Sequence, residues 1–271
     1  MTDRYAVFGN PIAHSKSPII HAQFAQQTQQ DMSYEALLAP VDGFAVAARE
    51  FFASGGLGCN ITVPFKLDAH DLADELTDEA SAAGAVNTLM RRQDGSLIGH
   101  NTDGDGLVRD LRDNLNVQLK NKRILILGAG GASRGTILPL LNQQPALIHI
   151  ANRTAQKAIE LAAKFAAHGD VSGSGYDALD ESFDIIINAT SSGLNDEVPP
   201  IPKKALAEDG CGYDMMYSST ATAFQHWLTA HGAAVAADGA GMLVEQAASA
   251  FAFWRGVRPD DTHTALQLIN N

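Results

Sequence analysis

The chain has 271 residues, of which 45% are hydrophobic, and a formal net charge of −12. The length suffices for one large domain or two ordinary ones, and the acidic balance argues against a nucleic-acid surface, which needs a basic face. No apolar stretch approaches the ~18 residues of a membrane span, and the N-terminus lacks a signal-peptide core, so we expect a cytoplasmic protein with no membrane partner. Cys59 and Cys211 lie far apart without metal-ligand spacing, and no metal site is expected.

Short apolar runs alternate with helical patterns along the whole chain, which is typical of an α/β fold. Residues 4–10 predict a first strand. Residues 17–27 predict a helix with Ser17 at its N-cap and Pro18 at its first helical position.

Two more strands are predicted at residues 34–41 and 58–63, with a helix between them that Asp42 would cap. Farther along, Asp94 and Gly95 separate two strand-like runs, and an Asp-Gly pair in that setting predicts a β-hairpin. Because a hairpin is antiparallel, this first part of the chain should mix parallel and antiparallel pairing.

From residue 123 onward the strands change character. Residues 123–128, 146–152 and 184–189 are apolar runs that suit strands buried on both faces, and helical patterns separate them. Such βαβ units form a parallel sheet with right-handed crossovers. Residues 242–257 predict a last helix, which we expect to return to the first domain. The predicted fold class is α/β with two domains, an N-terminal one with a mixed sheet and a Rossmann-like, doubly wound one.

The turn after the strand at 123–128 is rich in glycine. Gly128 permits a tight turn, and Gly130 lets a pyrophosphate approach the backbone at the start of the next helix. Ser133 occupies the third glycine position of the usual motif, where a small residue still allows close packing. The pattern indicates a dinucleotide site, and the alternative is a structural turn before an ordinary helix.

The residues after the second of these strands distinguish NADP from NAD. An NAD site places an acid there to bind the ribose, whereas this chain has Asn152, Arg153 and Thr154, followed by Lys157. A guanidinium can hold a 2′-phosphate with paired hydrogen bonds, which a carboxylate would repel. We therefore predict NADP, the alternative for Arg153 being a solvated surface charge.

Thr190 and Ser191 follow the strand at 184–189. In a doubly wound sheet the carboxyl ends of the strands face the ligand crevice. We expect both residues at the lip of the cofactor site, although a simple turn fits the pattern nearly as well.

Several motifs together closely resemble the shikimate dehydrogenase family, in the right order and over nearly the whole chain. They are GNPIAHSKSP (9–18), CNITVPFK (59–66), GAVNT (84–88), GHNTDGDG (99–106), GAGGASR (128–134), NRT (152–154), DMMY (214–217) and GMLVEQA (241–247). The resemblance implies reversible, NADPH-dependent reduction of 3-dehydroshikimate to shikimate, a step of aromatic amino-acid biosynthesis, by a monomer or homodimer. It also implies a substrate domain over 1–102, an NADP domain over 103–238 and returning C-terminal helices over 239–271.

The resemblance further implies individual residue roles. Lys66 and Asp103 would form the catalytic pair. The residues implied for substrate binding are Ser15, Ser17, Asn60, Thr62, Asn87, Tyr217 and Gln246. The residues implied for NADP binding are Gly128, Ala129, Gly130, Gly131, Ala132, Ser133, Asn152, Arg153, Thr154, Lys157, Thr190, Ser191, Met215, Gly239 and Met242.

Elementary chemistry supports part of the substrate assignment. Ser15 and Ser17 stand at a predicted helix N-terminus, where hydroxyls, free N–H groups and the dipole favour a carboxylate. The alternative is that Ser17 only caps the helix. The amides of Asn87 and Gln246 donate and accept, which suits vicinal hydroxyls.

Lys66 follows Pro64, which ends a strand and directs the next turn. Asp103 opens the following helix, so it can face Lys66 across the substrate. A nearby carboxylate favours the ammonium form, while burial disfavours it. The ammonium would supply a proton or hydrogen bond to the developing alkoxide. Either Lys66 alone or the pair as one unit would move the proton.

Three alternatives remain at this point. A quinate/shikimate dehydrogenase of broader range would place an acid after the second Rossmann strand, although substrate breadth stays open. A non-catalytic NADP and small-acid sensor would lack Lys66 or Asp103, and a folate-linked dehydrogenase would need a different motif than HSKSP. The family often has a second arginine where this chain has Lys157, so the NADP preference should be milder.

Overall fold

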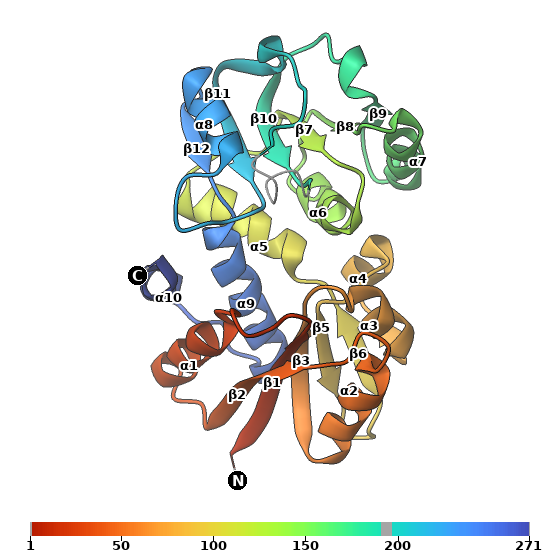
Figure 1. Cartoon of the computed structure of the whole chain (residues 1–271), viewed down its shortest axis with the longest axis vertical. Helices are drawn as coiled ribbons and strands as arrows, with labels where there is room; N and C mark the ends of the chain where they lie inside the picture. The colour runs from red at the N-terminus through yellow and green to blue at the C-terminus, as the bar shows by residue number, and fades with distance from the viewer. Residues whose placement is uncertain (1, 191–196, 271) are drawn as a thin grey trace. The chain divides into compact units, whose positions relative to one another are not determined.

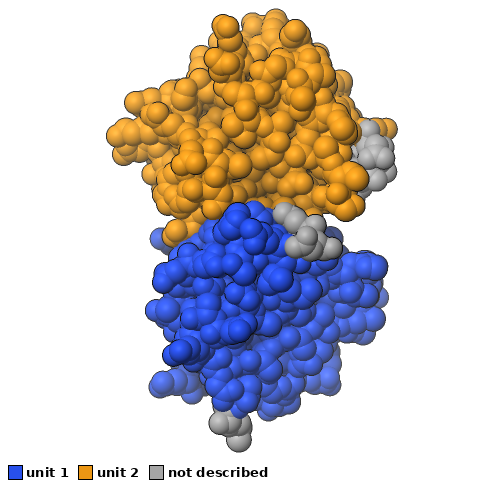
Figure 2. Space-filling view, turned by 90° about the vertical axis from the view of Figure 1, so that its left-hand side faces the viewer, with its two compact units in different colours: residues 1–106, 243–271 blue, residues 107–242 orange. Residues whose placement is uncertain are grey.

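The structure is a computed structural model that describes residues 2–190 and 197–270. The chain divides into two compact units, which Figure 2 colours separately. Unit 1 consists of Met1–Gly106 with Leu243–Asn271, and unit 2 consists of Leu107–Met242. Within the described part of the chain, none of the helices combines the length and apolarity needed to cross a bilayer.

Unit 1 is built on a sheet with strand order β2-β1-β3-β5-β6-β4 (Figure 1). The strands are β1 (Asp3–Gly9), β2 (Met32–Leu38), β3 (Gly56–Ile61), β4 (Glu75–Leu76), β5 (Thr88–Arg91) and β6 (Leu97–His100). Strand β1 is parallel to β2 and β3, whereas β5 is antiparallel to β3 and β6. The mixed sheet is therefore confirmed, and so is the hairpin, in which Gly95 has a φ of 91°.

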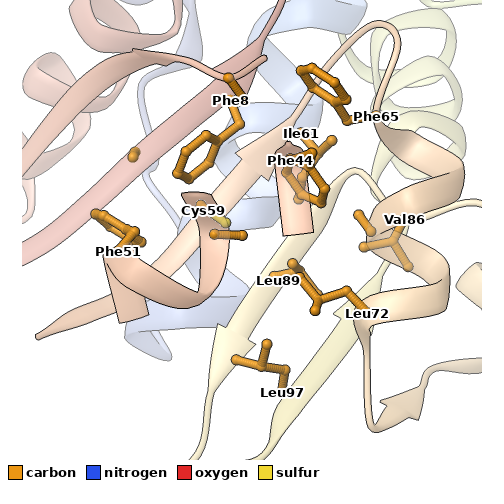
Figure 3. Close-up of a cluster of buried hydrophobic side chains, with 14 of the residues drawn as sticks. Phe8, Phe44, Phe51, Cys59, Ile61, Phe65, Leu72, Val86, Leu89 and Leu97 are labelled. Atoms are coloured by element: carbon orange, nitrogen blue, oxygen red, sulfur yellow. The ribbon is translucent and has the colours of Figure 1, made fainter. Parts of the chain in front are cut away.

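Helices cover both faces of this sheet. They are α1 (Ser17–Gln27), α2 (Phe44–Ala53), α3 (Lys66–Leu72), α4 (Asp78–Ala83), α10 (Thr262–Asn270), and the parts of α5 (Asp103–Arg109) and α9 (Ala240–Arg255) that belong to unit 1. Because side chains alternate along a strand, β1 sends Phe8 into the core with α2 and α3 and Tyr5 against Trp254 of α9. Figure 3 shows the first cluster, in which Phe8 meets Phe44 and Phe51 edge to face.

Three local predictions in unit 1 are wrong in detail. The N-cap of α1 is Lys16, not Ser17, because the Ser15 hydroxyl accepts a hydrogen bond from the Ser17 N–H and starts the helix one residue earlier. The N-cap of α2 is Gly43, not Asp42. Strand β2 ends at Leu38 rather than residue 41, because Gly43 N–H bonds to the Pro40 carbonyl and closes a turn there.

Unit 2 contains an all-parallel sheet with strand order β12-β11-β10-β7-β8-β9. Its strands are β7 (Arg123–Leu127), β8 (Leu147–Ala151), β9 (Val171–Ser174), β10 (Phe183–Asn188), β11 (Leu206–Asp214) and β12 (Val235–Ala237). The helices beside them are α6 (Gly131–Leu141), α7 (Ala155–Phe165) and α8 (Ala223–Ala230). The chain winds outward from β7 in one direction and then from β10 in the other, as in a doubly wound fold. The Rossmann-like prediction is confirmed, with the switch point between β7 and β10.

Both cysteines lie in the interior as free thiols. Burial raises the pKa of Cys211 to about 12 and raises the pKa of Cys59 further. Neither thiol is activated as a nucleophile. Within the described residues, no group of three or more His, Cys, Asp or Glu side chains could hold a metal ion.

Candidate active site

Lys66 and Asp103 form an ion pair in unit 1. Lys66 is the first residue of α3 and Asp103 is the first residue of α5. The lysine Nζ lies 2.5 Å from Asp103 Oδ2, and the two side chains are 34% and 15% exposed. Phe65, the fully buried N-cap residue of α3, anchors the turn between β3 and Lys66. The pair is thus partly shielded but reachable by a ligand.

Asn87 holds the other oxygen of Asp103. Its Nδ2 donates to Asp103 Oδ1 at 2.8 Å, and the Asp103 N–H donates to Asn101 Oδ1 at 3.1 Å. Hydrogen bonds to a charged group are shorter and stronger than neutral ones. With Lys66 on Oδ2 and Asn87 on Oδ1, both carboxylate oxygens are engaged and the orientation of Asp103 is fixed.

Gln246 of α9 reaches the same group of residues. Its Oε1 accepts from Thr102 Oγ1 at 3.2 Å and from Asn87 Nδ2 at 3.4 Å, and its Nε2 donates to the Leu243 carbonyl. Thr102 is fully buried and was not singled out from the sequence. The structure therefore brings Lys66, Asp103, Asn87 and Gln246 together from four separate segments of the chain.

The serine pair lies at the N-terminus of α1. Ser15 Oγ accepts the Ser17 N–H at 3.3 Å, and the Ser15 N–H bonds to the Ile12 carbonyl. Ser17 is buried and Ser15 is half-buried. Burial raises the pKa of Tyr34, and hydrogen bonding with the Ser17 side chain partly opposes that rise. The Tyr34 hydroxyl donates to Asn60 Oδ1 at 2.7 Å.

The other predicted substrate residues have different settings. Asn60 is buried, and its Nδ2 bonds to the Asn87 carbonyl and to Thr88 Oγ1. Thr62 is half-buried beside Gly9, at which a side chain would collide with the Thr62 methyl group. Tyr217 lies in unit 2 with 44% of its surface exposed. Asn60 thus supports its neighbours, whereas Tyr217 belongs to the other unit.

The glycine-rich turn of unit 2 presents backbone to open space. Gly128 has a φ of +103°, which few side chains tolerate, and a Cβ there would meet Thr190 and Ala189. A Cβ on Gly130 or Gly131 would meet no atom of the described residues within 4 Å. Ser133 is buried, and its Oγ donates to the Gly128 carbonyl at 2.8 Å, which fixes the turn.

The N-terminus of α6 accordingly fits a pyrophosphate. Gly130 is its N-cap residue, and no side chain caps it. The free N–H groups of the first turn and the helix dipole favour an anion. Ala129, Gly131 and Ala132 bring no polar side chain to this position, so it is the backbone that would bind the phosphates.

A positively charged segment follows β8. Arg153, Thr154 and Lys157 are exposed, and the Asn152 side chain donates to the Thr154 carbonyl at 3.0 Å. In the part of the chain that the structure describes, neither Arg153 nor Lys157 has an ion-pair partner. Two unpaired cations beside the glycine-rich turn fit a 2′-phosphate.

The last predicted cofactor residues surround the end of β11. Gly239 N–H bonds to the Met216 carbonyl, and a side chain on Gly239 would strike the backbone of Met215. The Met242 N–H donates to the Tyr213 hydroxyl at 3.3 Å. Thr190 bonds through its N–H and hydroxyl to Asn188 Oδ1 after β10. Ser191 lies outside the described residues.

Thr88, Thr102 and Tyr34 are the residues of this region that sequence reasoning missed. Thr88 and Thr102 each follow an asparagine, in GAVNT and HNTDG. That repeated Asn-Thr pair was the available signal, because an amide and a hydroxyl can each both donate and accept hydrogen bonds. Tyr34 offered no signal in the sequence.

Comparison with known proteins agrees with this geometry. The family model described as "Shikimate dehydrogenase substrate binding domain" matches residues 7–89. The models "Shikimate / quinate 5-dehydrogenase" and "Shikimate 5'-dehydrogenase C-terminal domain" match residues 110–196 and 239–264. These models together cover more than half of the chain.

Individual relatives point the same way. The "Shikimate dehydrogenase (NADP(+))" of Herminiimonas arsenicoxydans is 58% identical over 96% of this chain and 94% of its own. A crystal structure of an Ael1 enzyme from Pseudomonas putida is 44% identical with a TM-score of 0.94, covering 100% of this chain and 99% of that one. A shikimate 5-dehydrogenase from Thermus thermophilus in complex with NADP(H) and shikimate is 31% identical with a TM-score of 0.86, covering 99% and 98%.

Proposed function

This chain belongs to the shikimate dehydrogenase family, and we propose that it catalyses the reversible NADPH-dependent reduction of 3-dehydroshikimate to shikimate in aromatic amino-acid biosynthesis. The observation that most supports this is the Lys66–Asp103 ion pair, bridged by Asn87 to Gln246. An ammonium and a fixed carboxylate beside two amides suit a polyhydroxylated acid. The open N-terminus of α6 in unit 2 supports a dinucleotide as the second reactant.

We assign the proton transfer to Lys66. In the reductive direction its ammonium donates a proton or hydrogen bond to the substrate oxygen on which negative charge develops. Asp103 orients Lys66 through the 2.5 Å contact and is itself held by Asn87. In the oxidative direction the Lys66 amine accepts the proton of the substrate hydroxyl.

We assign the remaining substrate contacts to further polar side chains. Ser15 and Ser17, at the N-terminus of α1, would bind the carboxylate. Asn87 and Gln246 would bind the ring hydroxyls, for which their amides would exchange some of the hydrogen bonds they make within the chain. Thr62 and Tyr217 would make the other substrate contacts. Asn60 would support the site through its hydrogen bonds to the Asn87 carbonyl and to Thr88 Oγ1.

We assign NADP binding to unit 2. The backbone at Gly130 and Gly131 would hold the pyrophosphate, and Arg153 and Lys157 would hold the 2′-phosphate. When bound, the reduced nicotinamide supplies the hydride that the ketone carbon accepts. Residues 1–102 and 239–271 would then form the substrate domain and residues 103–238 the cofactor domain.

An assay with paired substrates and cofactors tests this function. Purified protein is mixed with shikimate or quinate and with NADP or NAD, in all four combinations, and formation of the reduced nicotinamide is followed by absorbance. We expect shikimate with NADP to give by far the highest kcat/KM. Absence of turnover with shikimate and either cofactor would overturn the proposal.

A broader quinate and shikimate activity is the second candidate. The family model that matches residues 110–196 includes quinate in its description. Arg153, which replaces the ribose-binding acid of an NAD site, favours the narrower NADP enzyme. Comparable kcat/KM values for quinate and shikimate in the same assay would establish the broader activity.

We further propose that the enzyme works in the cytoplasm as a monomer or homodimer, without a nucleic-acid partner. The net charge of −12 supports the last point, and the two buried free thiols fit a reducing compartment. Light scattering coupled to gel filtration would decide between one and two copies. A larger assembly would contradict the proposal.

A further inference from the structure

A chain of hydrogen bonds lies beneath the ion pair of unit 1. The Tyr34 hydroxyl donates to Asn60 Oδ1 at 2.7 Å, and Asn60 Nδ2 donates to Thr88 Oγ1 at 3.1 Å. The Thr88 hydroxyl donates in turn to Asn87 Oδ1 at 2.8 Å. Asn87 Nδ2 then donates to Asp103 Oδ1 at 2.8 Å. Each link donates in the same direction, toward the carboxylate that holds Lys66.

The direction of this chain follows from the chemistry of its members. A side-chain NH₂ group can only donate, so the contact from Asn60 Nδ2 makes Thr88 Oγ1 an acceptor there. The single hydroxyl proton of Thr88 is then free for Asn87 Oδ1. The Thr102 backbone N–H, also only a donor, meets the same Asn87 oxygen at 2.9 Å. Asn87 must therefore turn its NH₂ group toward Asp103.

The residues of this chain of hydrogen bonds are buried, which raises the cost of losing any one contact. Thr88 is fully buried, Asn87 is 2% exposed and Asn60 is 6% exposed. Water cannot readily replace a lost partner at such positions, and hydrogen bonds in a buried chain polarise one another. The members come from β2, β3, the start of β5 and α5, so these elements must pack together to assemble the chain of hydrogen bonds.

We propose that Thr88 is a positioning residue for the reaction, which fixes the Asn87 amide so that Asp103 stays aimed at Lys66, with Asn60 and Tyr34 completing its support. This inference rests on the proposed dehydrogenase function. Thr88 touches neither Lys66 nor Asp103 through any contact that the structure gives. Its effect should therefore appear in kcat, through the aim of the ion pair, more than in the KM for shikimate or NADP.

Two substitutions of Thr88 separate positioning from packing. Thr88→Val keeps the shape of the side chain but removes the hydroxyl, and Thr88→Ser keeps the hydroxyl but removes a buried methyl group. If the Thr88 hydroxyl positions Asn87, Thr88→Val lowers kcat about 10-fold and leaves the KM values for shikimate and NADP within about 3-fold of wild type. Thr88→Ser then retains at least about half of the wild-type kcat. If Thr88 acts only by packing, the order is reversed, because Thr88→Ser leaves a cavity.

The measurements are steady-state kinetics and thermal unfolding of the full chain in each variant. A kcat for Thr88→Val equal to that of wild type, or equal losses for Thr88→Val and Thr88→Ser, would overturn the inference. Tyr34→Phe, at a residue two hydrogen bonds farther from Asp103, should lower kcat less than Thr88→Val, and a larger loss would also count against the chain. Wild-type protein without activity on shikimate would refute the proposed function instead, so the two failures are distinguishable.

Discussion

The candidate sites of the two units are built in opposite ways. In unit 1, side chains from segments far apart in the sequence interlock, as Lys66, Asn87, Asp103 and Gln246 do. In unit 2, one short turn offers backbone N–H groups and open space, with Gly130 at its centre. A side-chain site depends on the chemistry of each member, while a backbone site depends on leaving room. Substitutions that remove a group should therefore harm unit 1, and substitutions that add one should harm unit 2.

Removal of the Lys66 ammonium should have the largest effect. We expect Lys66→Ala to lower kcat by roughly 10²–10⁴-fold, the span of general acid–base contributions, with a smaller change in KM. Steady-state kinetics in the direction of shikimate oxidation would measure it. Lys164→Ala, at an exposed lysine of α7, is the matched control and should leave kcat unchanged. A Lys66→Ala enzyme with near-normal kcat would rule out the role of this lysine.

Arg153 tests a place where the proposed site of unit 2 depends on a side chain. We expect Arg153→Ala to lower kcat/KM with NADP by about 10–100-fold and to leave kcat/KM with NAD nearly unchanged, because a charge-assisted contact to the 2′-phosphate is lost. Lys157→Ala should have a smaller effect of the same sign, since an ammonium is a point charge rather than a fork. An unaltered ratio of NADP to NAD efficiency in Arg153→Ala would disprove the assignment.

The same contrast explains what the sequence could and could not predict. The turn at Gly128 and the parallel strands β7, β8 and β10 are contiguous patterns, and the structure has them where the sequence predicted them. The hairpin at Asp94 and Gly95 was readable for the same reason.

Local end signals were less reliable. Ser17 and Asp42 looked like N-caps, yet the helices begin from Lys16 and Gly43 because neighbouring turns fix the start. Tyr34 could not be found, because its partner Asn60 is 26 residues away in sequence. The Asn-Thr pair pointed to Thr88, but not to its bond with Asn60, which is 28 residues away. Strand β9, which completes the sheet of unit 2, was not among the strands predicted from the sequence.

His21 gives unit 1 a sensitivity to acid. It is fully buried, stacks on Tyr34 with ring centroids 4.1 Å apart, and neither ring nitrogen has a hydrogen-bond partner among the described residues. Burial lowers its pKa to about 3 from 6.5. Between pH 6.5 and about pH 3, His21 is therefore protonated in the unfolded chain but neutral in the folded chain. The free energy of unfolding decreases as the pH is lowered through that range.

Replacement of His21 should remove this part of the pH dependence. On going from pH 8 to pH 5, His21→Phe should lose about 2 kcal/mol less unfolding free energy than wild type. Urea unfolding of both proteins at the two pH values measures the difference, and other titrating groups cancel in the comparison. Identical losses in the two proteins would show that His21 does not titrate in this window.

The smallest effects are expected from alanine at Gly130 and at Gly128. Comparison of the two variants distinguishes a glycine that leaves room for a ligand from a glycine that relieves backbone strain. At Gly130 the backbone has a φ of −89°, and a new Cβ meets none of the described atoms within 4 Å. Gly130→Ala should therefore keep the melting temperature and raise the KM for NADP several-fold, since the methyl group occupies the approach of the pyrophosphate. At Gly128 the φ of +103° strains any side chain, so Gly128→Ala should cost about 1–2 kcal/mol of stability. If Gly130→Ala lowered the melting temperature as much as Gly128→Ala does, the open space at Gly130 would not be the reason for its glycine, and the contrast between the two units would fail at this point.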